Sequence, residues 1–220
     1  RSRDKTLMRN PVAWAVSKRA ERSWTPWNQI VDLVANGDYR GTYTLADAVS
    51  VDSKRINIIE MTENDIDEEN ITGGYLIELD NNYSQEPYHF KSWYGNNLSI
   101  HEPDEDVIQY DQIEYIRDYM NNVESHIFSA DYQDPENGYR ALFDSLALAS
   151  WYLTVEYTAN CDGLYSIYCY KDQADDHLYM GPIWDYDIAF NNCHRLGEMT
   201  DKLMIDYGYS KIPSISIAFI

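Results

Sequence analysis

Two aspartates flank a predicted β-hairpin in the C-terminal third of the chain. Residues 165–171 and the segment that begins at residue 177 are rich in Tyr and Ile, which indicates two strands. The polar residues between them fit a hairpin loop centred near Ala174. Asp162 precedes the first strand and Asp185 follows the second. An antiparallel hairpin would therefore bring the two aspartates side by side, with Cα atoms about 4.5–5.5 Å apart.

Two carboxylates at this separation repel each other unless a cation, a shared proton or a substrate lies between them. In phosphoryl-transfer sites, one carboxylate orients or deprotonates the acceptor hydroxyl and another holds the metal that bridges the nucleotide phosphates. By position, Asp162 takes the first role and Asp185 the second. Asp187 would point to the same face as Asp185 if the backbone is extended, and could then share Mg²⁺ or Mn²⁺. The alternative is that Asp187 caps a turn.

Five segments in collinear order resemble the spore-coat protein H (CotH) kinase family. Residues 181–187, Gly-Pro-Ile-Trp-Asp-Tyr-Asp, resemble its Pro-x-Trp-Asp-Phe-Asp signature. Residues 4–10, Asp-Lys-Thr-Leu-Met-Arg-Asn, and 36–43, Asn-Gly-Asp-Tyr-Arg-Gly-Thr-Tyr, resemble two earlier family segments. Residues 54–58 and 73–80 also match. Because five motifs agree in order, the resemblance covers most of the chain.

The resemblance implies an α+β, atypical protein-kinase-like fold that phosphorylates protein hydroxyls with ATP and Mg²⁺ or Mn²⁺, in a secreted or cell-surface setting. It implies catalytic roles for Asp162 and Asp185, and a metal site at Asp185 and Asp187. We expect a CotH kinase-like domain over residues 1–195 and a C-terminal segment of the same domain over 196–220. Because the chain starts at a motif found mid-domain in relatives, we expect an N-terminally truncated fragment with an incomplete small lobe.

Two positions depart from the family pattern. Asp47 stands where relatives usually have Glu near the end of the second hairpin strand, and its shorter arm could fail to reach a partner lysine. His101 stands where relatives tend to have Lys, and histidine is mostly neutral at pH 7. Lys91, Lys54 and Arg55 are candidate phosphate-binding cations, as is a residue upstream of this chain. Each also fits a solvated surface cation.

The charge of the chain restricts its partners. A formal net charge of −20 at pH 7 excludes nucleic acid and anionic membranes as main partners. It suits a protein substrate, a basic one in particular, or a site that recruits divalent cations. The sequence contains no run of about 20 apolar residues that would predict a membrane-spanning helix.

The cysteines predict no cross-link. There are three of them, Cys161, Cys169 and Cys193, without CxxC spacing. An odd number without that spacing argues against a disulfide framework and against a zinc site. We therefore expect Cys161, next to the candidate catalytic Asp162, to be a small buried side chain.

The rest of the sequence predicts the elements that must position the hairpin. Apolar residues at helical spacing predict three helices, and Asn36-Gly37 predicts a tight turn between two strands. The expected helices are 6–22, 109–128 and 140–159, and the expected strands are 29–35, 39–46, 75–79 and 212–220, with a loop-rich stretch over 81–106.

Two other functions compete with a kinase. A non-catalytic, kinase-like module for adhesion or surface assembly is motivated by Asp47, His101 and the Tyr-rich acidic composition, because a fold does not guarantee its chemistry. A glycosidase would use two carboxyl groups about 5–9 Å apart.

Overall fold

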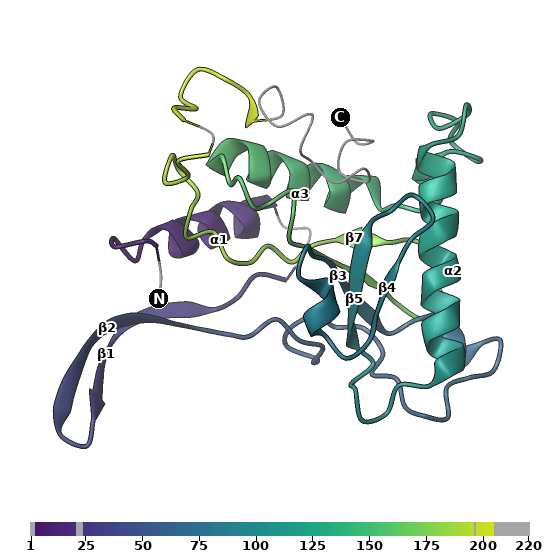
Figure 1. The fold of residues 1–220 in the computed structure, drawn as a ribbon, viewed down its shortest axis with the longest axis horizontal. Coiled ribbons are helices and arrows are strands. Elements are labelled where there is room, and N and C mark those ends of the chain that lie inside the picture. Colours follow the sequence, from purple (N-terminus) through teal and green to yellow (C-terminus); the bar gives the residue numbers. More distant parts are fainter. Residues whose placement is uncertain (1–2, 21–23, 196, 205–220) are drawn as a thin grey trace.

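The computed structural model describes residues 3–20, 24–195 and 197–204 and combines helices with two antiparallel sheets (Figure 1). The helices are α1 (Arg9–Ala20), α2 (Tyr110–Ile127) and α3 (Ser145–Thr158), with short 3₁₀ turns at Asn70–Thr72, Tyr83–Gln85 and Tyr139–Ala141. The strands are β1 (Asn28–Ala35), β2 (Asp38–Ala46), β3 (Tyr75–Leu79), β4 (His89–Lys91), β5 (Asn97–Glu102), β6 (Ile167–Lys171) and β7 (Tyr179–Met180). The predicted α+β class is confirmed.

The central sheet has the strand order β4-β5-β3-β6-β7, and every neighbouring pair is antiparallel. Its middle strand, β3, is buried along its whole length, as expected for a strand with neighbours on both sides. The predicted C-terminal hairpin is present: Tyr170 lies opposite Tyr179 and Cys169 opposite Met180, which centres the turn beside Ala174. Because β7 has only two residues, the ladder ends well before the flanking aspartates.

One apolar core joins the sheet to all three helices. It contains residues of α1, α2 and α3 and the inward side chains of β3, β5, β6 and β7. The α1 helix packs against α3, and α3 contacts β7 (Figure 1). This packing fixes the end of α3, from which the chain enters the turn before β6. None of the helices among the described residues is both long and apolar enough to cross a membrane.

The β1–β2 hairpin projects away from the central sheet (Figure 1). Its turn residues Asn36 and Gly37 have φ angles of 54° and 84°. This left-handed geometry suits Asn-Gly and matches the twist of the flanking strands, so the predicted hairpin is confirmed. Asp47 closes the base of the hairpin, because its Oδ2 accepts a 3.1 Å hydrogen bond from the Trp27 backbone N–H.

Two sequence-based boundaries are corrected. The stretch 81–106 contains two strands, β4 and β5, and in β5 the apolar Leu98 and Ile100 alternate with polar residues. The third helix begins at Ser145, because the Asp144 side chain accepts a 2.6 Å hydrogen bond from the Ala147 N–H and caps the helix. The expected strand 212–220 lies outside the described residues.

Candidate active site

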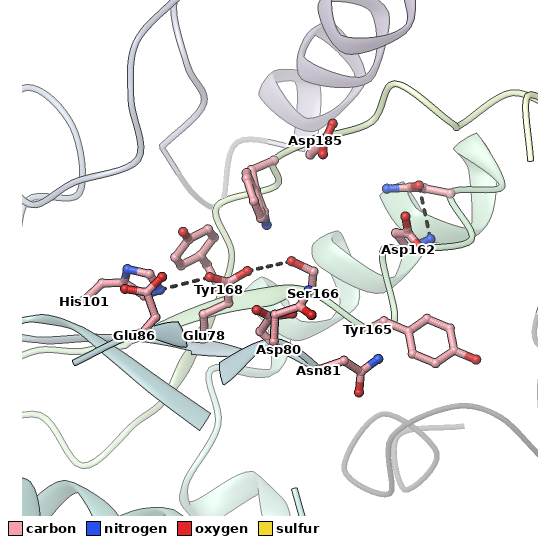
Figure 2. A pocket seen from close by; sticks show the side chains of 13 residues that line it. Glu78, Asp80, Asn81, Glu86, His101, Asp162, Tyr165, Ser166, Tyr168 and Asp185 are labelled. Carbon is pink, nitrogen blue, oxygen red and sulfur yellow. Dashed lines mark hydrogen bonds and ion pairs between the residues drawn. The ribbon is translucent and has the colours of Figure 1, made fainter. Parts of the chain in front are cut away.

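Two cavities meet at Asp162 and Asp185. The first has a volume of about 390 Å³ and lies at one end of the central sheet (Figure 2). The second has a volume of about 490 Å³, and both aspartates also line it. Asp187 lines only the second cavity. The structure therefore brings the three predicted site residues together, with Asp162 and Asp185 on the boundary between two spaces.

The turn between α3 and β6 holds Asp162. The helix ends at Ala159, which adopts a left-handed conformation with φ 47°. The Asp162 carbonyl then accepts hydrogen bonds from the backbone N–H groups of Tyr165, at 2.9 Å, and Ser166, at 3.1 Å. The Asp162 backbone N–H donates to the side-chain oxygen of Asn160, a residue that is only 1% exposed. Asp162 is thus placed by backbone contacts, and its side chain remains available to the cavities.

The backbone of Asp185 is left-handed and not extended. Its φ is 49°, so the expectation that extended backbone aligns Asp185 with Asp187 is wrong. The two carboxyl groups nevertheless line the same cavity, and the charge of Asp187 raises the pKa of the Asp185 carboxyl. Tyr186 between them is buried at 2% exposure and anchors the turn in the core. The second oxygen of Asp187 accepts a 2.8 Å hydrogen bond from the Arg3 backbone N–H.

The electrostatics around Asp185 favour a bound cation. The cavity walls partly desolvate its carboxyl and raise its pKa above the ordinary value, and the charges of Asp187 and Asp162 raise it further. A divalent ion between these oxygens would remove that repulsion. Mg²⁺ typically takes one or two protein carboxylates and completes its coordination with water and substrate phosphates. Among the described residues, no three His, Cys, Asp or Glu side chains form a group that could hold a metal ion by themselves.

The first cavity is strongly acidic. Figure 2 shows Glu78, Asp80 and Glu86 facing it from the sheet side, with Asp185 and Asp162 on the other walls. Glu78 is 5% exposed and accepts hydrogen bonds from Ser166 Oγ at 2.6 Å, and it contacts His101 Nε2 at 2.9 Å. Since no lysine or arginine among the described residues lines this cavity, an anionic ligand would have to enter it together with cations.

His101 is the basic side chain that the structure places in the first cavity. Its ring lies 5.2 Å from the ring of Tyr168, centroid to centroid, and its Nε2 hydrogen-bonds to Glu78 Oε2. The three other cations proposed from the sequence line neither cavity. Lys91 and Lys54 are exposed, and Arg55 donates a hydrogen bond to Ser50 Oγ at 2.5 Å. Sequence reasoning thus did not locate the cation of this site.

The second cavity contains a cation that the sequence analysis did not single out, Arg195. The Arg195 guanidinium forms an ion pair with Asp162 Oδ1 and lies 3.2 Å from Cys161 Sγ. Arg195, Arg3 and His194 line the second cavity together with the three aspartates. The separation of 33 residues between Arg195 and Asp162 carries no local signal, so only the folded chain reveals the contact.

A disulfide holds this contact in place. Cys161 and Cys193 are bonded, with their Cα atoms 6.5 Å apart, so the expectation of no disulfide is wrong, although Cys161 is buried as expected. The odd cysteine count arises because Cys169 lies buried and unpaired in β6. Counting could not reveal the pair, because it forms only where the chain returns past the end of α3 after β7.

The N-terminal segment supports the loop that carries Asp185 and Asp187. Arg9 Nε donates a 3.0 Å hydrogen bond to the Ala189 carbonyl, and the Asn10 side chain accepts one from the Tyr186 N–H. Asp4 in turn holds Arg9 through its guanidinium and its backbone N–H. The first and last of the five motifs are therefore neighbours in space, and the first buttresses the last.

The fold and the site define a mixed α+β protein in which Asp162 and Asp185 lie at the junction of two cavities and Asp187 lines one of them. The family model described as CotH kinase protein matches residues 2–214 of the 220-residue chain. The chain therefore belongs to the CotH kinase family. No curated protein matches it significantly.

Proposed function

We propose that this chain has a kinase-like fold and is an atypical protein kinase that transfers the γ-phosphoryl group of ATP to protein hydroxyls with Mg²⁺ or Mn²⁺. The observation that supports this most is the position of Asp162 and Asp185, which line both cavities. A donor nucleotide and an acceptor hydroxyl could reach this pair from opposite sides. The family membership is consistent with this chemistry.

Each aspartate has a distinct role in the proposal. Asp185 and Asp187 would hold the metal, which would neutralise the negative charge of the nucleotide phosphates. Asp162 would accept the proton of the acceptor hydroxyl. The acceptor oxygen forms a bond to the γ-phosphorus while the bond from that phosphorus to the β–γ bridging oxygen breaks, and ADP leaves with the electron pair. Positioning and charge neutralisation carry most of the rate gain in such reactions.

The first cavity suits the nucleotide. Its volume of about 390 Å³ falls within the usual size of small-molecule sites. Tyr168 and Trp184 line it, with ring centroids 5.5 Å apart, and supply aromatic surface on which an adenine can pack. The acidic walls would admit the nucleotide as its metal complex, which makes binding depend on the divalent ion.

The setting and the partner follow from chemistry and family. A disulfide persists in oxidising compartments, so the Cys161–Cys193 bond supports an extracellular or cell-surface location. The net charge of −20 disfavours nucleic acid and anionic membranes and is compatible with a protein substrate.

A non-catalytic module for adhesion or surface assembly remains the second candidate. The observation in its favour is the acidity of the first cavity, where His101 is the basic side chain among the described lining residues. The carboxylate residues that line it are Glu78, Asp80, Glu86, Asp162 and Asp185. In addition, Arg195 already neutralises Asp162 without a metal. A scaffold that has lost nucleotide binding would tolerate both features.

Calorimetry with ATP in the presence and absence of Mn²⁺ separates the two functions, combined with a phosphorylation assay on the full protein. A kinase binds ATP only with the metal, and Asp185→Asn abolishes that binding. Asp162→Asn retains binding but lowers phosphoryl transfer by about 10²-fold or more, the usual contribution of a general base. Asp38→Asn, on the exposed β1–β2 hairpin, is the control and leaves both unchanged. No binding at millimolar ATP by the wild type would establish the non-catalytic function.

A further inference from the structure

The ion pair between Arg195 and Asp162 contributes little to the stability of the fold. The two side chains are 49% and 43% exposed. Exposed pairs of this kind are worth about 0–1 kcal/mol. The pair nevertheless lies at the boundary of the two cavities, and both residues line the second one. Its position therefore calls for an explanation other than stability.

The disulfide places the two residues opposite each other. Asp162 follows Cys161 directly, and Arg195 lies two residues beyond Cys193. The guanidinium also packs against the disulfide itself, 3.2 Å from Cys161 Sγ. A short covalent path thus connects the carboxylate to the arginine. The same segment is also held by the Asn192 side chain, which donates to the Asp187 carbonyl at 2.8 Å.

Arginine has the geometry for a second ligand at this point. Its planar guanidinium group has five N–H donors, and its geometry matches both carboxylates and phosphates. Only Asp162 Oδ1 takes part in the ion pair, through Nη2. Arg195 lines the second cavity together with Asp185 and Asp187, where a metal-bound phosphate would lie.

We propose that Arg195 is the cation that binds the transferred phosphoryl group, and that the Cys161–Cys193 disulfide is the positioning element that keeps it there. This inference rests on the proposed kinase function and adds a cation in the second cavity, next to the aspartates. Arg195 donates to the non-bridging oxygens of the γ-phosphoryl group, while Asp162 receives the proton of the acceptor hydroxyl. The disulfide neither gains nor loses electrons during the transfer.

The proposal predicts discrimination between ATP and ADP. Because Arg195 contacts the γ-phosphoryl group, Arg195→Gln weakens calorimetric binding of Mn²⁺–ATP by about 10-fold and leaves that of Mn²⁺–ADP nearly unchanged. Autophosphorylation and transfer to casein fall by about 10²-fold in kcat, the usual effect of losing one charge-stabilising donor. Arg195→Lys recovers part of the binding, because the charge remains while the planar guanidinium group is lost. Arg117→Gln is the matched control, since Arg117 is another partly exposed, ion-paired arginine.

A double-mutant cycle tests the role of the disulfide. Cys161→Ser with Cys193→Ser lowers kcat in the wild-type background by about 10-fold, and causes little further loss when Arg195→Gln is already present. Equal losses in both backgrounds would show that the disulfide acts on the fold and not through Arg195. If the serine variant does not fold, as seen in its melting curve, the comparison of ATP with ADP still decides the role of Arg195.

The outcomes separate this inference from the proposed function. A wild type that binds no Mn²⁺–ATP and transfers no phosphate overturns the kinase proposal, and the phosphoryl role of Arg195 with it. An active wild type whose Arg195→Gln variant binds ATP and turns over normally overturns the role of Arg195 alone. An equal loss of ATP and ADP affinity would also overturn it, because it would indicate a general structural effect.

Discussion

Asp4→Asn should destabilise the protein in a pH-dependent manner, although Asp4 lies outside both cavities. Asp4 is 4% exposed and has unusually many donors. Its Oδ1 accepts from the Thr6 N–H at 2.9 Å and the Thr6 hydroxyl at 2.6 Å, and its Oδ2 accepts from the Arg9 N–H at 2.9 Å. The Arg9 guanidinium adds an ion pair at 2.5 Å. An asparagine would fill the space but lose the charge.

The magnitude follows from the pKa of Asp4. Burial by itself raises the pKa of this carboxyl, but the hydrogen bonds from Thr6 and Arg9 more than offset it and lower the pKa from 3.8 to about 2. The folded pKa lies below the unfolded one, so the contribution is fully present above the unfolded pKa and is lost as pH falls toward the folded pKa. At about 1.4 kcal/mol per pKa unit, it amounts to roughly 2 kcal/mol at pH 7 and about half of that at pH 3.

Urea denaturation of wild type and Asp4→Asn between pH 3 and pH 7 measures this directly. The difference in unfolding free energy should be about 2 kcal/mol at pH 7 and shrink as the pH falls. Asp38→Asn is the control, because Asp38 pairs with Arg40 at the surface, and it should change stability by less than about 0.5 kcal/mol at any pH. A difference for Asp4→Asn that stays constant from pH 7 to pH 3 would refute the electrostatic reasoning.

Further predictions concern the metal site and two glycines. Mn²⁺ at about 100 times its dissociation constant should stabilise the wild type by roughly 2.7 kcal/mol and leave Asp185→Asn unchanged, as a melting series would show. Because the pKa of Asp185 is raised, the metal-free protein should lose stability as pH rises through that pKa, and the affinity for metal should weaken as pH falls through it. Without metal at pH 7, Asp185→Asn should therefore be more stable than the wild type. An Asp185→Asn variant that is less stable than the metal-free wild type would contradict this. Gly73→Ala should cost about 3 kcal/mol or more in urea denaturation, because its Cβ would lie 2.0 Å from the Asp172 backbone carbon. Gly37→Ala, in open space at φ 84°, should cost only about 1 kcal/mol, and equal costs for the two would show that the close approach at Gly73 is unimportant.

Local patterns in the sequence determined most of the fold elements. The Asn36-Gly37 turn, the strand Tyr75–Leu79 and the helix over 110–127 all follow from signals within a few residues of one another. The hairpin around Ala174 follows from two Tyr- and Ile-rich runs on either side of a polar loop. Such features depend on backbone propensity and on the period of apolar residues, which a single sequence displays.

The strands of 81–106 were harder to predict. The strand β5 pairs with β3 across 19 to 26 residues, and its side chains are polar at every second position over residues 97–101. Strand formation there depends on pairing with a buried neighbour, and that is a property of the tertiary structure and not of the segment.

Symmetry about the hairpin turn was enough to predict that Asp162 and Asp185 belong to one site, but not how they meet. The ladder of β6 and β7 ends at Met180, and a left-handed Asp185 then lines the same cavity as Asp187. Backbone dihedrals of this kind are imposed by the surroundings, here by the buried Tyr186 and the support of Asn10. Local sequence preference alone would have favoured an extended segment.

The sequence by itself determined the family motifs, the acidic charge that restricts the partners, and the residue types able to hold a metal and accept a proton. Only the tertiary structure decided which cation joins them. Arg195 and the Cys161–Cys193 bond become part of the site because the chain returns to the end of α3 after passing through β7. Contacts across 32 or 33 residues depend on where the whole core places each segment, and no local pattern encodes that placement.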